Sequence, residues 1–155
     1  MDKGAYILLL KNDECRIMTG ARGEISFSAG WHGYVGSALG PGGLSRVLRH
    51  FRLNEKKDKR PRWHIDFLLL SPCFQVMRAY CIHTSERIEC LLAGQITGKV
   101  ISGFGSTDCS CKGHLFYFAD DPHEDILHLV SSITEKEGPS SHTDILILYP
   151  EEVCQ

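Results

Sequence analysis

Two glycine–tyrosine triplets constrain the fold of this chain more than any other feature of its sequence. Gly4-Ala5-Tyr6 opens the first apolar run, and Tyr34-Val35-Gly36 closes the second. Both runs have the length and composition of short strands, so a tyrosine is expected at one end of each of two neighbouring strands. A helical pattern that carries arginines follows the second triplet. Cleavage of a phosphodiester bond requires a cation at the charged phosphoryl oxygens, and an arginine of this helix could supply it.

The length and composition predict one small domain. The chain has 155 residues, 43% of them hydrophobic, which suffices for a single core. Apolar runs such as Tyr6–Leu10 and Phe67–Leu70 are far too short to span a membrane. The amino terminus has no signal-peptide pattern, and the seven cysteines are scattered. We therefore expect a cytoplasmic protein without a membrane partner, whose cysteines are reduced thiols or in part metal ligands.

Hydrophobic periodicity predicts an α/β (α+β) domain with a small mixed, mostly antiparallel sheet flanked by helices. The expected strands, of which the second and third form an inserted hairpin, are Tyr6–Lys11, Cys15–Thr19, Glu24–Phe27, Gly30–Gly36, Phe74–Ile82, Leu115–Phe118 and Ile145–Tyr149. Four helices are expected. The first carries the apolar stripe Leu44, Val47, Leu48 and Phe51, and the second is Trp63–Leu70. The third is capped by Thr84 or Ser85 and has Ile88, Leu91, Leu92 and Ile96 on its apolar face, and the fourth is Asp125–Ile133.

Positive charge is concentrated in one segment although the net charge is only −2. Arg46–Arg62 contains eight Lys or Arg and two acidic residues, so it carries +6 and the remainder of the chain −8. A basic stripe on an acidic body suits local phosphate binding better than general coating of DNA, and the alternative is a solvated loop. The predicted contacts to nucleic acid are Arg49, His50, Lys56, Lys57, Arg60, Arg62 and His64. We expect Arg46, Arg49 and His50 to share the polar side of their helix, while His64 has the alternative of starting a helix beside a packed Trp63.

The order of these groups resembles the core of the GIY-YIG nucleases. Ala5 and Val35 replace the two isoleucines of that motif, and both tyrosines and both outer glycines are present. The resemblance implies that Tyr6 and Tyr34 act in the catalytic site and that Arg46 binds phosphate. It also implies that a glutamate on a later helix binds one divalent metal, Mg²⁺ or Mn²⁺.

Two glutamates compete for the metal, and two arginines for the phosphate. At about 100° per residue, Glu89 lies on the border of the apolar stripe while Glu86 points to solvent, so Glu89 is the predicted ligand. Arg49 competes with Arg46 because it lies on the same helix face. Each group also has an ordinary structural alternative: a packed tyrosine, an exposed arginine or a salt-bridged glutamate.

Longer strings resemble a narrower and largely uncharacterised family, found mainly in archaea and in some bacteria, that contains a GIY-YIG core. These strings are GYVGSALG from Gly33, Gly43-Leu44 with Arg49-His50, RWHIDFLL from Arg62, GFGSTDC from Gly103 and HLF from His114. The resemblance covers Gly4–Phe118. It implies a GIY-YIG-like domain over residues 1–120 and a C-terminal extension, 121–155, packed on the same domain.

A second cluster offers metal ligands of another kind. Cys109, Cys111 and His114 form a C-x-C-x2-H pattern with three zinc-type ligands. No second Cys/His pair follows at standard spacing, so His123 or His128 would supply a fourth ligand. The alternative is a tight thiol-containing loop near the active site, and magnesium or manganese is expected in preference to zinc.

These patterns favour one hypothesis and leave two alternatives. The principal hypothesis is a metal-dependent DNA endonuclease acting in repair or recombination, on structure-specific or damaged DNA. The alternative is a nucleic-acid-binding protein that keeps the GIY-YIG fold and does not cleave. A third hypothesis is a small interaction protein stabilised by zinc.

Overall fold

A six-stranded antiparallel sheet forms the centre of the molecule. The structure is a computed structural model, and it describes residues 2–105, 111–136 and 145–153. The strand order is β6-β7-β4-β1-β5-β8, and each neighbouring pair is antiparallel. The strands are β1 Gly4–Asn12, β4 Gly30–Ala38, β5 Phe74–His83, β6 Lys99–Val100, β7 Leu115–Phe118 and β8 Ile145–Leu148.

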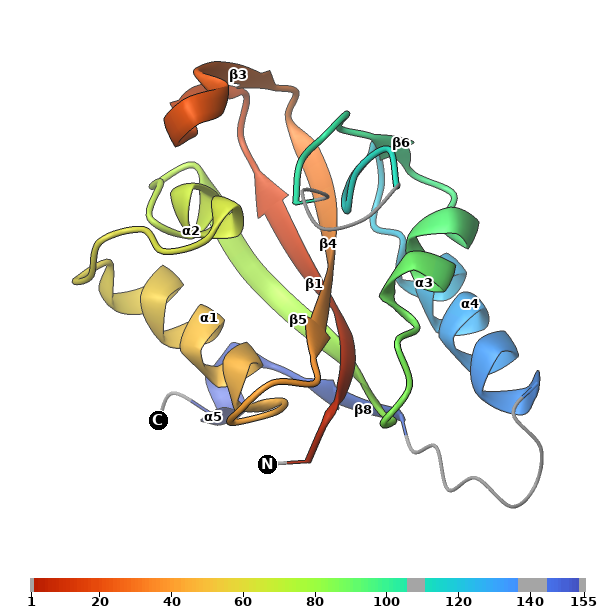
Figure 1. Cartoon of the computed structure of the whole chain (residues 1–155). Helices are drawn as coiled ribbons and strands as arrows, with labels where there is room; N and C mark the ends of the chain where they lie inside the picture. The colour runs from red at the N-terminus through yellow and green to blue at the C-terminus, as the bar shows by residue number, and fades with distance from the viewer. Residues whose placement is uncertain (1, 106–110, 137–144, 154–155) are drawn as a thin grey trace.

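Helices cover both faces of this sheet (Figure 1). One face carries α1 Ser45–Lys56 and α2 His64–Leu69, and the other carries α3 Glu89–Gln95 and α4 His123–Lys136. A short α5, Pro150–Val153, follows β8. The hairpin of β2 Cys15–Met18 and β3 Glu24–Phe27 forms a separate two-stranded sheet, with the 3-10 turn Gly20–Arg22 at its tip.

The central strand β1 is buried on both faces because its residues alternate between two cores. Tyr6, Leu8 and Leu10 pack with α1 and α2, whereas Ala5, Ile7 and Leu9 pack with α3 and α4. Leu44, Val47 and Phe51 of the predicted amphipathic stripe belong to the first core. The alternation therefore fixes the side of the sheet on which the Tyr6 ring lies.

The predicted fold class is confirmed: a small antiparallel sheet flanked by helices, with an inserted hairpin. β8 pairs with β5 at the sheet edge, as expected for the last apolar run. The helix α4 also contacts β5, so the chain after residue 120 packs on the same sheet. The domain boundary at residue 120 stays a prediction.

Three details differ from the sequence-based expectations. The third helix begins at Glu89 instead of at Thr84 or Ser85, although Thr84 Oγ1 accepts a hydrogen bond from the Glu86 amide at 3.1 Å. Leu91, expected on its apolar face, is 47% exposed because so short a helix buries little beyond Leu92 and Ala93. The two-residue β6 was missed. No helix among the described residues is long and apolar enough to cross a membrane.

Candidate active site

Three of the predicted catalytic residues line one cavity. Tyr6 from β1, Tyr34 from β4 and Arg46 from α1 border a cavity of about 550 Å³, together with Trp63 and His64 at the start of α2. The rings of the two tyrosines lie 6.4 Å apart, centre to centre. The strands bring them together because β1 and β4 pair directly, with Tyr6 opposite Gly36 and Leu8 opposite Tyr34.

Gly36 provides the space for the Tyr6 ring. A Cβ atom at Gly36 would lie 2.3 Å from Tyr6 Cζ and 2.4 Å from its hydroxyl oxygen, closer than any real contact. The glycine of the second triplet is therefore required by the tyrosine of the first. Tyr6 itself is 1% exposed.

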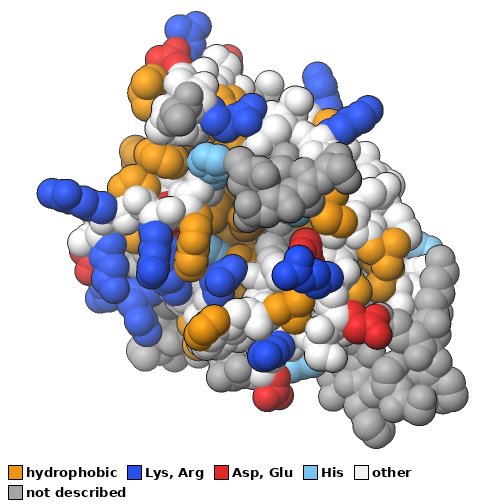
Figure 2. All heavy atoms as spheres, viewed as in Figure 1, with side chains coloured by type: hydrophobic (Ala, Val, Ile, Leu, Met, Phe, Trp, Pro, Cys, Tyr) orange, Lys and Arg blue, Asp and Glu red, His pale blue; other side chains and the backbone are white. Residues whose placement is uncertain are grey.

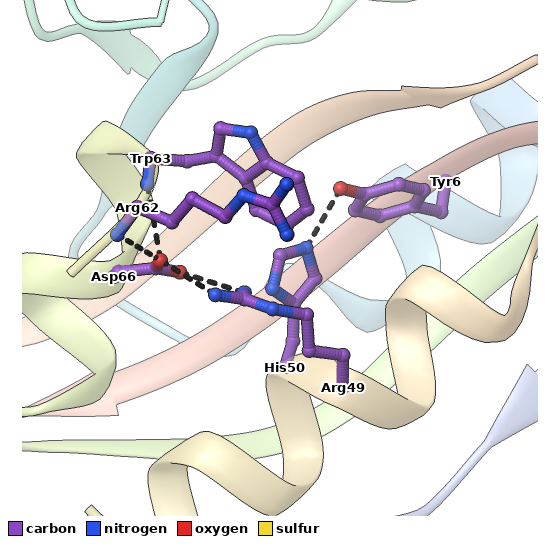
Figure 3. Close-up of polar contacts among 6 residues, drawn as sticks. All are labelled: Tyr6, Arg49, His50, Arg62, Trp63 and Asp66. Carbon is purple, nitrogen blue, oxygen red and sulfur yellow. Dashed lines mark hydrogen bonds and ion pairs between the residues drawn. The ribbon is translucent and has the colours of Figure 1, made fainter. Parts of the chain in front are cut away.

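His50 holds the hydroxyl group of Tyr6. The Tyr6 hydroxyl and His50 Nε2 are 2.8 Å apart, and both side chains are buried (Figure 3). The expectation that His50 lies on the exposed side of α1, in contact with nucleic acid, is wrong. Its position, three residues after Val47 and next to Phe51, places it at the edge of the apolar stripe, where the ring turns inward to Tyr6.

Burial shifts the pKa values of all three rings. It raises the pKa of Tyr6 well above 10.0, with Tyr34 adding to the shift and Arg46 opposing it. It raises the pKa of Tyr34 to about 12, again against the effect of Arg46. Burial lowers the pKa of His50 to about 3, although Asp66 opposes this. His50 is therefore a neutral imidazole at physiological pH and can accept the hydrogen of the Tyr6 hydroxyl.

Arg46 and Arg49, which compete for the phosphate, have different surroundings. Arg46 Nη1 donates to the Ser37 carbonyl at 2.7 Å, and its guanidinium lies 4.7 Å from the centre of the Trp63 ring, at the cavity. Arg49 instead forms two hydrogen bonds with the carboxylate of Asp66, at 3.1 and 2.9 Å. Because the Arg49 guanidinium is hydrogen-bonded to Asp66, Arg46 is the one of these two arginines that can bind a ligand in the cavity.

Asp66 organises the wall of the cavity behind Arg49. Besides Arg49, its carboxylate accepts hydrogen bonds from the backbone amides of Arg62 at 2.7 Å and Trp63 at 3.0 Å (Figure 3). Burial raises the pKa of Asp66, but these hydrogen bonds outweigh it and bring the pKa below 3.8. Asp66 is 0% exposed, so it serves the architecture of the site and does not contact a ligand.

Glu89 lies in a neighbouring cavity. This second cavity, of about 680 Å³, shares Tyr34 and Gly105 with the first and is also lined by Cys90 and His114. Glu89 Oε2 is buried and has no hydrogen-bond partner within the described part of the chain. Its charge partly offsets the lowering of the His114 pKa by burial. Glu86 is exposed, as expected. The structure thus brings Tyr6, Tyr34 and Arg46 together at the first cavity. Glu89 lies in the second cavity, which Tyr34 also lines.

A match to a family model covers most of the chain. The model, described as "Domain of unknown function DUF123", matches residues 5–135. The chain belongs to this family. No curated protein and no solved structure matches the chain. In this DUF123 chain both tyrosines, Arg46 and Glu89 lie inside the matched range.

The basic residues of the DUF123 domain fall into two groups. Arg62 and His64 line the first cavity, and Lys56 and Arg60 are exposed. Figure 2 shows Lys and Arg side chains gathered at the left of the view, over α1 and the connection to α2. Lys57 differs, because its Nζ donates to the carbonyls of Leu69 and Ser71 at 2.8 and 3.2 Å. Lys57 therefore fastens the end of α2.

The predicted zinc ligands are brought together only in part. Cys111 and His114 lie close together, and Cys90 of α3 joins them, with the three ligand atoms within 4.8 Å of one another. Cys109 lies outside the described residues. His123, expected as a fourth ligand, instead has its Nδ1 2.6 Å from the Tyr80 hydroxyl. Among the described residues, this candidate metal-ligand group contains neither His123 nor His128.

The contacts of His50 and Asp66, and the position of Cys90 beside Cys111 and His114, were not predicted from the sequence. A signal existed for His50, because it lies four residues after Arg46 and therefore on nearly the same helix face, toward the cavity. Asp66 follows Trp63 by three residues, the spacing at which a carboxylate accepts the amides at a helix start. No local signal identifies Cys90, since its partners lie 21 and 24 residues further along the chain.

Proposed function

We propose that this protein is a metal-dependent endonuclease of GIY-YIG type that hydrolyses phosphodiester bonds in DNA. The observation that carries the proposal is the meeting of Tyr6, Tyr34 and Arg46 at one cavity, with Glu89 in the cavity on the other side of Tyr34. These groups come from four elements and more than eighty residues of sequence. Their order also matches the GIY-YIG resemblance of the two triplets, the arginine and the later glutamate.

The first cavity suits a phosphate group. Arg46 supplies a fixed positive charge at its wall, since a guanidinium stays protonated and can donate two parallel hydrogen bonds to phosphate. Arg62 lines the same cavity, and its guanidinium lies 5.7 Å from the centre of the Trp63 ring. The exposed Lys56 and Arg60 extend this charge along the surface, where they would contact neighbouring phosphates of a DNA strand.

The hydrogen bond between Tyr6 and His50 directs the chemistry of the phenol. In the tautomer with an unprotonated Nε2, neutral His50 accepts the Tyr6 hydrogen, which leaves the lone pairs of the phenol oxygen to accept a hydrogen from an attacking water. Arg46 favours the anionic form of the phenol and so opposes the effect of burial. Tyr34 borders both cavities, so its hydroxyl is suited to position the same water or a phosphoryl oxygen.

Glu89 fits a divalent metal ion. A buried carboxylate oxygen without a hydrogen bond is costly, and a cation would satisfy it. A single carboxylate, completed by waters and substrate phosphate, is an ordinary magnesium environment. When bound, the ion would lower the pKa of nearby hydroxyl groups and stabilise the leaving oxygen.

Two substitutions test the assignment. In Mg²⁺ or Mn²⁺, Tyr34→Phe and Glu89→Gln should each reduce nicking of plasmid and branched DNA by at least about 100-fold, the usual cost of a lost transition-state donor. Glu86→Gln is the matched control, because Glu86 is exposed just before α3. Its activity should equal that of the wild type. Undiminished nicking by both Tyr34→Phe and Glu89→Gln would reject the assignment.

A second candidate function is nucleic-acid binding without cleavage. The raised pKa of Tyr34 favours it, because a neutral phenol binds a phosphate oxygen as a hydrogen-bond donor. Binding to single-stranded, branched and damaged DNA, with no cleavage in either metal, would support this candidate over the endonuclease.

A further inference from the structure

We propose that Cys90, Cys111 and His114 bind a zinc ion, which fastens the loop before β7 to α3. Each residue offers one ligand atom, and the three atoms lie within 4.8 Å of one another. Tetrahedral zinc has bonds of about 2.3 Å to sulfur and about 2.0 Å to nitrogen, which puts neighbouring ligand atoms roughly 3.5–3.8 Å apart. A single ion can therefore contact all three atoms after small side-chain adjustments.

The backbone around His114 is already fixed in place. Its amide donates to the Phe104 carbonyl at 2.7 Å, and its carbonyl accepts a hydrogen bond from the Val35 amide at 2.8 Å. Cys111 precedes His114 by three residues, and its sulfur lies near the His114 ring. Between them, the Lys112 carbonyl accepts a hydrogen bond from the Gly103 amide. Two of the three ligands thus belong to one ordered turn, so that metal binding orders little additional chain.

The ligand types favour zinc and separate this site from the one proposed at Glu89. Two thiolates and an imidazole are soft or borderline ligands that select zinc, whereas magnesium requires oxygen. Cys90 is exposed, which gives the ion a route from solvent. Glu89 precedes Cys90 in α3, so the two sites are adjacent and differ in the metals they bind.

The position of the zinc site suggests its role. Gly105 has a φ of +72°, and a Cβ there would lie 3.1 Å from Tyr34 Cε2 and 3.5 Å from His114 Cβ. Tyr34, Gly105 and His114 therefore lie next to one another and line the same cavity. Zinc at His114 would hold the wall that separates the two cavities and would fix α3, with Glu89, against it. The ion would position the catalytic groups without taking part in the reaction.

Zinc content and cobalt binding of the full chain test this site. Protein purified without chelator should contain about one zinc ion per chain, and the metal-free protein should take up Co²⁺ with thiolate-to-cobalt absorption. Cys90→Ser, Cys111→Ser and His114→Ala should each weaken zinc binding by at least about 100-fold, since losing even an outer partner of a ligand costs 10–100-fold. Zinc should also raise the unfolding temperature of the wild type but of none of these variants.

Cys73→Ser is the matched control, because Cys73 is a half-buried thiol in the core on the other face of the sheet. It should bind zinc as the wild type does. Because Cys90 is exposed, Cys90→Ser should fold normally, and far-ultraviolet circular dichroism checks this. Zinc binding that survives Cys90→Ser, or depends on Cys109 in its place, would overturn the proposal, as would a wild type without the cobalt absorption. None of these measurements requires DNA cleavage, so they can fail independently of the proposed nuclease function.

Discussion

The two sides of the candidate site differ in how their polar groups are satisfied. On the side of α1 and α2, which we call the paired wall, His50 contacts Tyr6, and Asp66 binds Arg49 and two backbone amides. Only His50 Nδ1 lacks a partner among the described residues of this wall. On the side of α3, Glu89 keeps a buried carboxylate oxygen without a hydrogen bond.

This difference suggests different roles for the two sides: the paired wall positions the Tyr6 ring, and the side with Glu89 binds a ligand. A buried polar atom is costly unless it is paired, so a wall in which most buried polar atoms are paired adds to stability, while an unpaired carboxylate oxygen subtracts from it. We infer that the paired wall holds the Tyr6 ring in place before any ligand arrives. Glu89, by contrast, is retained at a cost that a bound cation would offset.

The largest effect on stability is expected from removing Asp66. Asp66→Ala leaves Arg49 and two amides without their acceptor and should lower the free energy of unfolding by about 3 kcal/mol. This is the low end for a broken buried pair, because the Arg49 side chain is 26% exposed. Glu89→Ala should leave it unchanged or raise it, since the substitution removes a buried carboxylate oxygen that has no hydrogen bond. Urea unfolding at pH 7 measures both.

The comparison of the two walls fails if Asp66→Ala and Glu89→Ala destabilise the protein equally. The double variant Arg49→Ala/Asp66→Ala provides a control. Its loss in free energy of unfolding should be smaller than the sum of the losses in Arg49→Ala and Asp66→Ala, because each single variant removes the same Arg49–Asp66 interaction.

An intermediate effect is expected from filling the space beneath Tyr6. Gly36→Ala should lower the free energy of unfolding by about 2 kcal/mol, because its Cβ would overlap a ring that His50 holds in place. Gly94→Ala is the matched control on the α3 side. No atom lies within 4 Å of its would-be Cβ, so this helical glycine should gain about 0.5 kcal/mol on replacement by alanine. Thermal unfolding that leaves Gly36→Ala at wild-type stability would show that the Tyr6 ring is mobile.

Most of the fold could be predicted because local pattern and tertiary structure agree in it. The apolar residues from Leu44 to Phe51 recur with the period of a helix, and all of them pack in the same core. The last apolar run, Ile145–Leu148, pairs at the sheet edge as predicted. The third helix was placed too early because Thr84 and Ser85 have good capping chemistry. The two-residue β6 carries no pattern of its own and forms only because it can pair with β7.

The candidate site was less predictable because its contacts cross long stretches of sequence. The triplets indicated that Tyr6 and Tyr34 would be neighbours, since paired strands bring them together. Helical periodicity assigned His50 to the polar side and could not show that the Tyr6 hydroxyl would draw it inward. The choice between Arg46 and Arg49 depends on Asp66, which a helix from another part of the chain supplies.

The smallest predicted effect is the pH dependence of the paired wall. Burial lowers the pKa of His50 to about 3 and that of His32, on the same face, to about 4, against 6.5 when unfolded. Between pH 6.5 and these values the unfolded chain binds protons that the folded protein does not, so stability is lost as the pH falls through this window. At up to 1.4 kcal/mol per pH unit for each group, His50 should account for about 1 kcal/mol of the loss between pH 7 and 5.5.

Replacement of His50 by a neutral side chain isolates its share of this loss. Glutamine at this position can still accept the Tyr6 hydrogen but does not titrate, so His50→Gln should lose about 1 kcal/mol less than the wild type over the same pH range. His128→Gln is the control, because His128 is exposed on α4, and it should lose as much as the wild type. Urea unfolding at pH 7 and pH 5.5 compares the three proteins. An identical loss in His50→Gln and wild type would mean that His50 takes up its proton equally in the folded and unfolded states, and protonated His50 would then donate to the Tyr6 oxygen and could not accept its hydrogen.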